Sequence, residues 1–567
     1  MSIHLKLAAM VVGVSACAAS VALADDGRDH DPSRHVLLIS IDGMHALDFE
    51  NCVASNTCPN LKALRASGVN YTRTSTSKPS DSFPGLMAIV TGGTPKLVGA
   101  YYDVAYDRVL APPAADTGNG VLHGSCITGQ ANGTRTEYEE GNEIDQTQLN
   151  GGSPAYSKFD GGIKSIDPAK LIRDPFKGCA PVYAWNFIRA NTIFGVIHHA
   201  GGYTAWSDKH AAYAAVSGPT GTAQPSNVDD YYSPEVNSNV IPLPGVKTAA
   251  GLDCAKVNMN GGDWTTDFDN IKCYDQLKVN AVLNWINAKT HLGTGAIPVV
   301  PKIYGMNFQA VSVGQKLIEN GVKGGYTDAA GTPTPAMLSE IRFVDGAIGQ
   351  FVDELKEKHL YESTTIIVTA KHGQSPVDTH RFFPIPGHSG ANGTPPSTVL
   401  GSTFLPDSEL NQIGPTEDDI SLLWLRPEAS TLDAVALLES NASVAGIGQI
   451  LYGPSLETVF DKPGLPSAGG DPRTPDIVVL PNVGVVYTGS TKKQAEHGGF
   501  AIDDTNVMLL VSNPSISART ITTFVETTQV APTILKILGL DPGSLDAVRK
   551  EGTAVLPGFQ HSEGSED

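Results

Sequence analysis

The sequence predicts an α/β fold in which a doubly wound sheet is flanked by helices, with loop insertions and a small cap. Residues 35–43 and 364–370 are short, continuous apolar runs, which are typical of buried parallel strands. Residues 335–358 carry apolar side chains at three- and four-residue steps, the pattern of an amphipathic helix. Strand, helix and strand in this order favour a doubly wound sheet. A third apolar run, residues 476–480, is expected to be a further strand of this sheet.

Size and composition exclude several classes of protein. The chain has 567 residues, of which 41% are hydrophobic and 17% charged, so it can bury an extensive core and is not a disordered chain. Its formal net charge of -20 and the absence of a Lys/Arg-rich run argue against binding to a nucleic acid polymer. A small anionic substrate would therefore need a local cation, most simply a metal.

The first 24 residues have the pattern of a cleaved export signal. Lys6 precedes an apolar stretch from Leu7 to Leu23, and small residues favour cleavage after Ala24. A lipoprotein signal ending at Cys17 is the alternative, which the continuing apolar run disfavours. No other stretch approaches the ~20 apolar residues of a membrane span. We expect a secreted or periplasmic protein, and its oligomeric state is left open.

Six cysteines remain after the signal, an even number that indicates disulfides in an oxidising compartment. The spacing contains no CxxC pair, which argues against a zinc–cysteine site. The local pairs Cys52–Cys58 and Cys254–Cys273 are candidates, and the full connectivity is left open. The six are Cys52, Cys58, Cys126, Cys179, Cys254 and Cys273.

Polar side chains that could bind a metal or act in catalysis follow two of the predicted strands. Asp42 comes at the end of the first strand, and Lys371 and His372 follow the strand at 364–370. Ligands of open α/β sheets gather at this carboxyl edge, so Asp42 is well placed to bind a metal. Ser82 stands two residues before Pro84, which can begin a helix, and a helix amino end favours an attacking oxygen and a phosphate. A cap of the turn or helix is the simpler role for Asp42 and Ser82 taken singly.

Taken together, these segments resemble the type I phosphodiesterase / nucleotide pyrophosphatase family of the alkaline phosphatase superfamily. The resemblance covers most of the mature chain and rests on the order and spacing of the motifs. It includes the strand ending in Asp42, Ser82-Phe83-Pro84, Val90-Thr91-Gly92, His372-Gly373, His497-Gly498 and the closing segment Val530–Leu540.

The resemblance implies an alkaline-phosphatase-like fold and a hydrolase that uses one or two divalent metals, usually zinc. Ser82 would be the nucleophile, where many relatives carry threonine, and would also contact the metal. Asp42 and His372 would bind that metal, and His497 would bind its partner. The expected substrate is a small phosphorylated compound, attacked to give a covalent intermediate that water then hydrolyses.

The chain departs from the family pattern at three ligand positions. Relatives carry aspartate where this chain has Lys371, and a protonated ammonium cannot bind a cation. Relatives also carry an aspartate and, four residues later, a histidine, where this chain is expected to have Asn307 and Val311. One cation would then remain on Asp42, His372, Ser82 and Asn307, with Asn307 also facing substrate.

Three explanations of these departures stay open. Lys371 could act in catalysis by taking over the charge of one metal, as in the one-metal sulfatase branch, which would also suit a sulfatase- or phosphonate-directed hydrolase. The metal site could have decayed in a non-catalytic binding protein. An unrecognised ligand could also complete the site; the candidates are Asp48, Asp378, His380 and His388.

The segment around Lys209 and His210 is expected to be a substrate-facing loop, with a surface turn packed by Trp206 as the alternative. The hydrolase domain is expected to span residues 33–545. Within it, residues 100–190 would be a variable loop and residues 400–470 an inserted cap. Residues 546–567, rich in Gly, Ser and Glu, are expected to be a flexible tail.

Overall fold

The computed structural model describes most of the chain after the proposed signal. The described residues are 35–117, 120–138, 141, 143–145, 162–237, 246–256, 263–387, 390–410 and 415–559. The expected signal peptide, Cys17 and His388 lie outside these residues.

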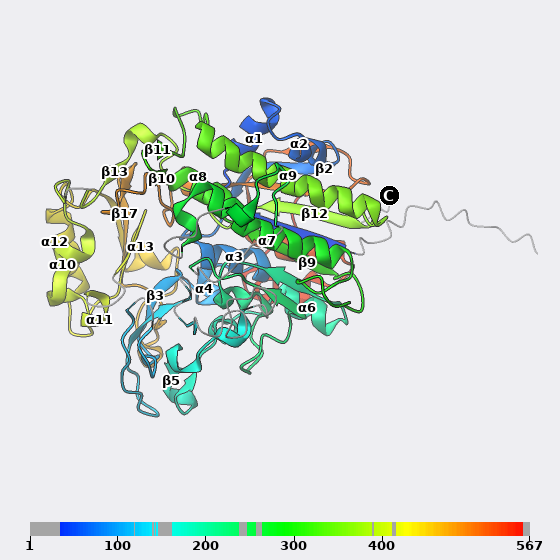
Figure 1. The fold of residues 1–567 in the computed structure, drawn as a ribbon. Coiled ribbons are helices and arrows are strands. Elements are labelled where there is room, and N and C mark those ends of the chain that lie inside the picture. Colours follow the sequence, from blue (N-terminus) through cyan, green and yellow to red (C-terminus); the bar gives the residue numbers. More distant parts are fainter. Residues whose placement is uncertain are drawn as a thin grey trace, which may run out of the picture. The chain divides into compact units, whose positions relative to one another are not determined.

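A nine-stranded sheet forms the centre of the fold (Figure 1). Its middle strands run parallel, while β19 lies antiparallel between β12 and β2. The expectation of an α/β fold with a doubly wound sheet is confirmed. In spatial order the strands are β20 (Arg519–Ile521), β2 (Gly68–Ser75), β19 (Asn506–Ser512), β12 (Thr364–Thr369), β1 (His35–Ile41), β9 (Ile303–Phe308), β7 (Ala205–Ser207) and β8 (Asp230–Tyr232), with β21 (Val525–Glu526) also on β2.

Strand β1 shows why consecutive residues in the central strands are apolar. Leu37, Ile39 and Ile41 belong to one hydrophobic cluster, whereas Val36 and Leu38 belong to the other. Successive side chains of a strand point to opposite faces, so a strand covered by helices on both faces needs apolar residues at every position.

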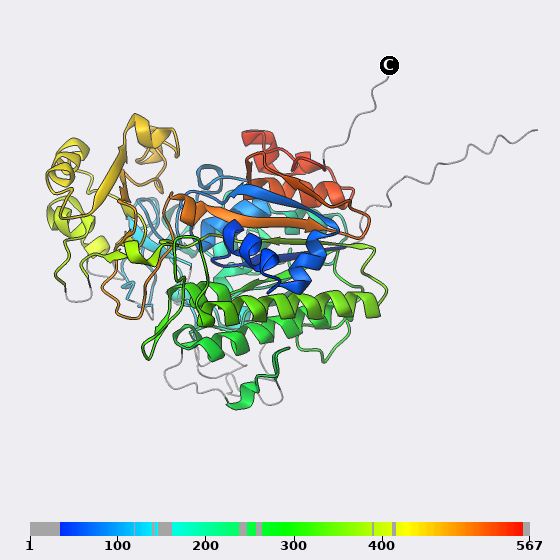
Figure 2. The same ribbon diagram turned by 90° about the horizontal axis from the view of Figure 1, so that it is seen from above.

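Helices cover both faces of the sheet. Figure 2 shows α7 and α9 (green) side by side on one face, where α8 packs against both. On the other face α3 packs against α6 and α15. The bounds are α1 (Ala46–Ala54), α2 (Pro59–Arg65), α3 (Ser82–Thr91), α6 (Ile193–His199), α7 (Phe268–Ile286), α8 (Ala310–Lys316), α9 (Pro335–Glu357) and α15 (Val530–Ile537).

A second, four-stranded antiparallel sheet lies apart from the first, with its helices on the left of Figure 1. One of its two central strands is β17, which contains the apolar run that the sequence assigned to the main sheet. That assignment is wrong, because Ile477 and Val479 are buried on one side of β17 and Val478 on the other, which gives the same pattern as a strand of the main sheet. The elements are β14 (Thr416–Glu417), β15 (Ser421–Leu423), β17 (Ile477–Pro481), β16 (Ile447–Tyr452), α10 (Pro396–Phe404), α12 (Thr431–Ser440) and α13 (Pro454–Glu457).

The chain does not become a tail at residue 546. Residues Asp546–Glu551 form α16, with Ala547 buried, and Leu556 is completely buried in the cluster beneath α3. The expected tail is therefore wrong for residues 546–559, because apolar side chains spaced among the charged ones anchor this segment.

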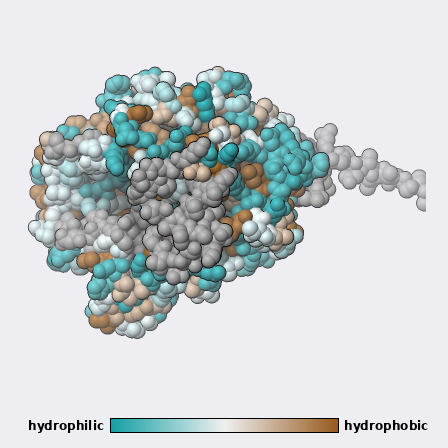
Figure 3. Space-filling view, viewed as in Figure 1, coloured by the Kyte–Doolittle hydropathy of each residue, from teal (hydrophilic) through white to brown (hydrophobic). Residues whose placement is uncertain are grey.

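Three disulfides connect six cysteines of the described residues. They pair Cys52 with Cys58, Cys126 with Cys179, and Cys254 with Cys273. Both local pairs expected from the sequence are confirmed. In the described residues no helix is both long and apolar enough to cross a membrane, and Figure 3 shows hydrophobic residues scattered among hydrophilic ones on one face.

Candidate functional site

Ser82 is the first residue of α3 and is completely buried. Asp81 caps the helix, its Oδ2 accepting a hydrogen bond from the Phe83 N–H at 3.2 Å. Gly85, one turn along, lies so close to β12 that an added Cβ would sit 2.2 Å from the carbonyl oxygen of Lys371. The glycine therefore allows α3 to pack directly against the backbone that carries His372.

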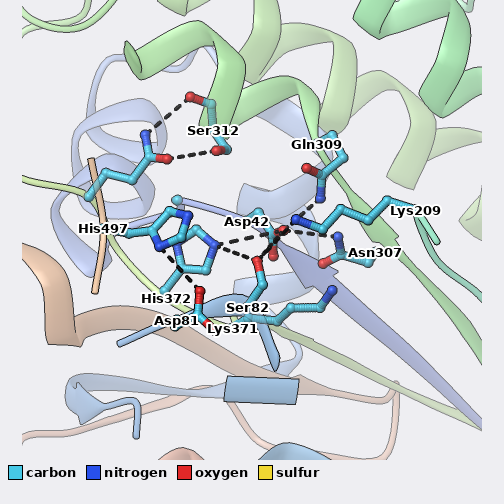
Figure 4. A network of polar contacts seen from close by, with 12 residues as sticks. Asp42, Asp81, Ser82, Lys209, Asn307, Gln309, Ser312, Lys371, His372 and His497 are labelled. Atoms are coloured by element: carbon cyan, nitrogen blue, oxygen red, sulfur yellow. Dashed lines mark hydrogen bonds and ion pairs between the residues drawn. The ribbon is translucent and has the colours of Figure 1, made fainter. Parts of the chain in front are cut away.

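Asp42 follows β1 and lies beside Ser82 (Figure 4). Its Oδ2 accepts hydrogen bonds from Gln309 Nε2 at 2.6 Å and Asn307 Nδ2 at 3.2 Å, while its Oδ1 has no hydrogen-bond partner. Burial favours the neutral acid, but the ammonium groups of Lys371 and Lys209 and the neighbouring His372 outweigh it and hold the pKa of Asp42 well below its usual range. Asp42 is therefore a carboxylate with one oxygen open to a cation.

His372 presents its Nε2 to Ser82. Its Nδ1 lies 2.8 Å from the carbonyl oxygen of Gly373, which accepts a hydrogen bond and so places the proton on Nδ1. Nε2 is left as an acceptor, 3.1 Å from Ser82 Oγ and 3.8 Å from Asp42 Oδ2. The serine hydroxyl can thus donate its hydrogen to His372.

Lys209 reaches Ser82 from the loop after β7. Its Nζ lies 3.3 Å from Ser82 Oγ, and the side chain is buried. Burial, the largest cause, and the neighbouring charge of Lys371 lower the pKa of Lys209 to about 8, against the opposing effect of Asp42. The alternative prediction, that the segment around Lys209 and His210 is a surface turn, is wrong. The segment directly follows β7 of the main sheet, and both side chains are buried.

Lys371 and His210 contact other partners. Lys371 Nζ forms a fully buried ion pair with Asp208 Oδ1 at 2.9 Å and lies 4.1 Å from the centre of the Tyr213 ring. His210 Nδ1 lies 2.7 Å from Glu235 Oε1. Neither side chain lines the cavity at Ser82.

His497 lies across from His372, with ring centres 4.1 Å apart. Its Nδ1 is 3.5 Å from Asp81 Oδ1 and makes no hydrogen bond. Burial, followed by the neighbouring His372, lowers the pKa of His497 well below its usual range, which favours the neutral imidazole. The structure brings His497 to the site, as expected.

Val311 does not face the site but packs into the hydrophobic core. The side chains of α8 that reach the cavity come from Gln309, Ser312 and Lys316, which the sequence reasoning missed. Gln309 could have been found, because it directly follows β9 as Asp42 follows β1. Ser312 and Lys316 then follow at helical steps of three and four residues.

The alternative ligands expected from the sequence have structural partners. Asp48 Oδ2 lies 2.8 Å from His45 Nδ1 at the start of α1, and Asp378 caps a short turn that contains His380. Neither carboxylate lines the cavity at Ser82.

The cavity above Ser82 has a volume of about 280 Å³ and a mostly polar lining. Besides the residues around Ser82 it is bordered by residues that follow the short helix α4 (Pro95–Val98), by residues of β14 and the turn after it, and by residues of the segment 493–496. These bordering residues include Tyr102, Asp103, Glu417, Asp418, Lys493 and Glu496.

Three donor atoms beside Ser82 have the spacing that one divalent cation would need. Ser82 Oγ lies 3.1 Å from His372 Nε2 and 3.5 Å from Asp42 Oδ2, and the latter two atoms are 3.8 Å apart. Ligands of a tetrahedral zinc with bonds of about 2.0 Å are roughly 3.3 Å apart, so these three atoms are close to the spacing of one such site. In the described residues no group of three His, Cys, Asp or Glu side chains could hold a metal, either beside Ser82 or around His497.

The family model of type I phosphodiesterase / nucleotide pyrophosphatase matches residues 36–127 and 188–501. The chain therefore belongs to the type I phosphodiesterase / nucleotide pyrophosphatase family. It is an enzyme that hydrolyses phosphoric esters, in a family that is generally dependent on divalent metals. No curated protein matches the sequence.

One solved structure shares the fold, and two others were found to be similar. Human ectonucleotide pyrophosphatase / phosphodiesterase 5 is 12% identical with a TM-score of 0.50, over 89% of this chain and 95% of that one. The murine protein is 14% identical with a TM-score of 0.48, over 90% and 96% of the two chains. An inactive form of the murine protein in complex with AMP is 13% identical with a TM-score of 0.48, over the same shares.

Proposed function

We propose that this protein is an exported phosphodiesterase that uses Ser82 as its nucleophile, one divalent cation and the ammonium group of Lys209. The observation that carries the proposal is the position of Ser82 Oγ. It lies at the amino end of α3, 3.1 Å from His372 Nε2 and 3.3 Å from Lys209 Nζ, at the base of the polar cavity.

Asp42, Ser82 and His372 would hold the cation, zinc by the chemistry of these donors, and it would lower the pKa of the serine hydroxyl. Lys209 places a positive charge beside the oxygen that attacks, where it also neutralises a non-bridging oxygen of the phosphoryl group. Asn307 and Gln309 hold Asp42 in place through its Oδ2. The free N–H groups at the start of α3 add positive potential at the same point.

The reaction on these residues is a double displacement. Ser82 Oγ forms a bond to phosphorus while the bond to the leaving alcohol breaks, and the serine proton goes to solvent or to the departing oxygen. Water then attacks phosphorus, the Oγ–P bond breaks, and Ser82 regains its proton. Substrates would be small phosphorylated compounds, since the cavity of about 280 Å³ is compact.

Lys209, rather than Lys371, supplies the extra positive charge in this proposal. Lys371 is committed to Asp208, so its ammonium is not offered to the phosphoryl group. The three disulfides support the exported location, because such bonds persist in oxidising compartments.

The test combines metal content with turnover of bis-p-nitrophenyl phosphate. About one metal per chain by mass spectrometry is expected, with turnover abolished in Ser82→Ala and kept in Ser77→Ala, a nearby buried serine that hydrogen-bonds Pro79. A trapped covalent adduct should map to Ser82. Metal-free protein with no Ser82-dependent turnover would support a non-catalytic binding protein instead.

A further inference from the structure

Helix α7 carries a buried acid–lysine pair where it contacts the turn between β9 and α8. Asp275 and Lys278 lie one helical turn apart and are both completely buried, with Lys278 Nζ 2.9 Å from Asp275 Oδ1. Their neighbours on the helix, Leu277 and Val279, belong to the hydrophobic core. A buried pair of this kind is often no more stabilising than apolar side chains of similar volume, so stability alone does not account for it.

Each member of the pair holds part of this turn. Asp275 Oδ2 accepts hydrogen bonds from the backbone N–H groups of Gln309 and Ala310, both at 2.8 Å. Lys278 Nζ donates a hydrogen bond to the carbonyl oxygen of Asn307. The N–H groups at the start of a helix have no acceptor within that helix, so Asp275 supplies the acceptor that the first turn of α8 lacks. The pair thus fixes the backbone on both sides of the point where β9 passes into α8.

The side chains of the same turn hold Asp42. Asn307 Nδ2 and Gln309 Nε2 both donate hydrogen bonds to Asp42 Oδ2 (Figure 4). Asn307 belongs to β9 and Gln309 immediately precedes α8, so a shift of the turn would move both amides together. Asp42 Oδ2 in turn lies 3.5 Å from Ser82 Oγ. The placement of this carboxyl group beside Ser82 therefore depends on a stretch of backbone that α7 holds.

We propose that Asp275 is a positioning residue of the reaction, which aims the two amides of the β9–α8 turn at Asp42, with Lys278 as its partner in the core. This inference rests on the proposed function, which gives Asp42 its role beside Ser82. Neither Asp275 nor Lys278 lines the described cavity, so the effect is transmitted through the turn and not by contact with substrate. A misplacement of about 1 Å at a reacting group can lower a rate by on the order of a hundredfold, which sets the scale of the effect.

Two double variants of the full mature chain separate the acceptor at position 275 from the loss of the buried pair. Asp275→Asn/Lys278→Met and Asp275→Leu/Lys278→Met each remove both charges together, so neither leaves an unpaired charge in the core. Asparagine can still accept from the two N–H groups, whereas leucine cannot. With bis-p-nitrophenyl phosphate, kcat should be about tenfold lower in the leucine variant than in the asparagine variant. Hydrogen exchange in a peptide covering residues 307–312, measured by mass spectrometry, should be faster in the leucine variant.

A second background distinguishes positioning from a general loss of structure. In Gln309→Ala the two double variants should differ in kcat by less than about threefold, because the side chain that Asp275 places is already absent. Lys272→Met is the matched control, since Lys272 lies on the same helix, pairs with Glu340 at 3.5 Å and does not line the cavity. Its loss should leave kcat and the exchange of residues 307–312 unchanged.

The outcomes separate this inference from the proposed function. Equal kcat values in the two double variants, or the same difference with and without Gln309, would overturn the inference and leave the proposed function in place. Faster exchange of residues 307–312 in the leucine variant, in a protein whose wild type shows no Ser82-dependent turnover, would support the placement of the turn by Asp275 and overturn the proposed function.

Discussion

Removing Lys371 should destabilise the protein through the carboxylate that it leaves behind. Lys371 and Asp208 are both completely buried, their charged atoms 2.9 Å apart, and Asp208 Oδ2 also accepts a hydrogen bond from Trp206 Nε1 at 3.0 Å. In Lys371→Met the Asp208 charge has lost its counter-ion, and breaking a buried pair in this way costs about 3–5 kcal/mol. For 567 residues, with an unfolding entropy of about 2.1 cal/mol/K per residue, this cost lowers the Tm by about 3–4 °C.

The double variant Asp208→Asn/Lys371→Met supplies the control. It removes both charges and keeps an amide to accept from Trp206, so most of the lost stability should return. Calorimetric melting of wild type, both single variants and the double variant gives the coupling free energy. Two results would refute the account of Lys371 as the counter-ion of Asp208. One is a Lys371→Met variant as stable as wild type, and the other is a double variant no more stable than Lys371→Met.

Two further predictions concern stability and geometry. Burial, followed by the nearby Glu235, raises the pKa of Glu143 to about 8; because the folded state holds this proton more tightly, stability should fall as pH rises from about 4 to about 8. Glu143→Gln should flatten that slope and melt above wild type at pH 9, and an unchanged Tm profile would contradict the shift. Gly85→Ala would place its Cβ 2.2 Å from the Lys371 carbonyl oxygen and push α3 away from the segment after β12, so turnover should fall at least about tenfold. Gly346→Ala is the control, because Gly346 also lies in a helix, α9, and an added Cβ there would meet only Ala249 Cβ, at 3.6 Å.

The central strands and the nucleophile helix could be predicted because their sequence patterns are local. Residues 36–39 and 366–368 are continuously apolar, and Pro84 marks the first turn of α3, which begins at Ser82. The strand at 477–481 has the same local pattern, yet it pairs with β15 and β16. A buried strand of one sheet differs from a buried strand of another only in the strands with which it pairs. This pairing depends on the whole fold and not on the local sequence.

Site residues that directly follow a strand could be predicted from the sequence. Residues whose position depends on contacts between distant segments could not. Asp42, His372 and Lys209 follow β1, β12 and β7, and all three reach Ser82. Lys371 follows β12 as well, but adjacent residues at a strand end point to opposite sides. Its partner Asp208 is 163 residues away in the sequence, so spacing could not reveal the pair.

Two amides share Asp42 with the proposed cation. Gln309 and Asn307 both donate to Oδ2, the same oxygen that lies 3.5 Å from Ser82 Oγ and 3.8 Å from His372 Nε2. Each donor uses lone-pair capacity of this oxygen and so weakens Oδ2 as a metal ligand, while Oδ1 has no hydrogen-bond partner among the described residues. In the function that we propose, Lys209 supplies, as an ammonium group beside Ser82, positive charge that a second metal would otherwise bring.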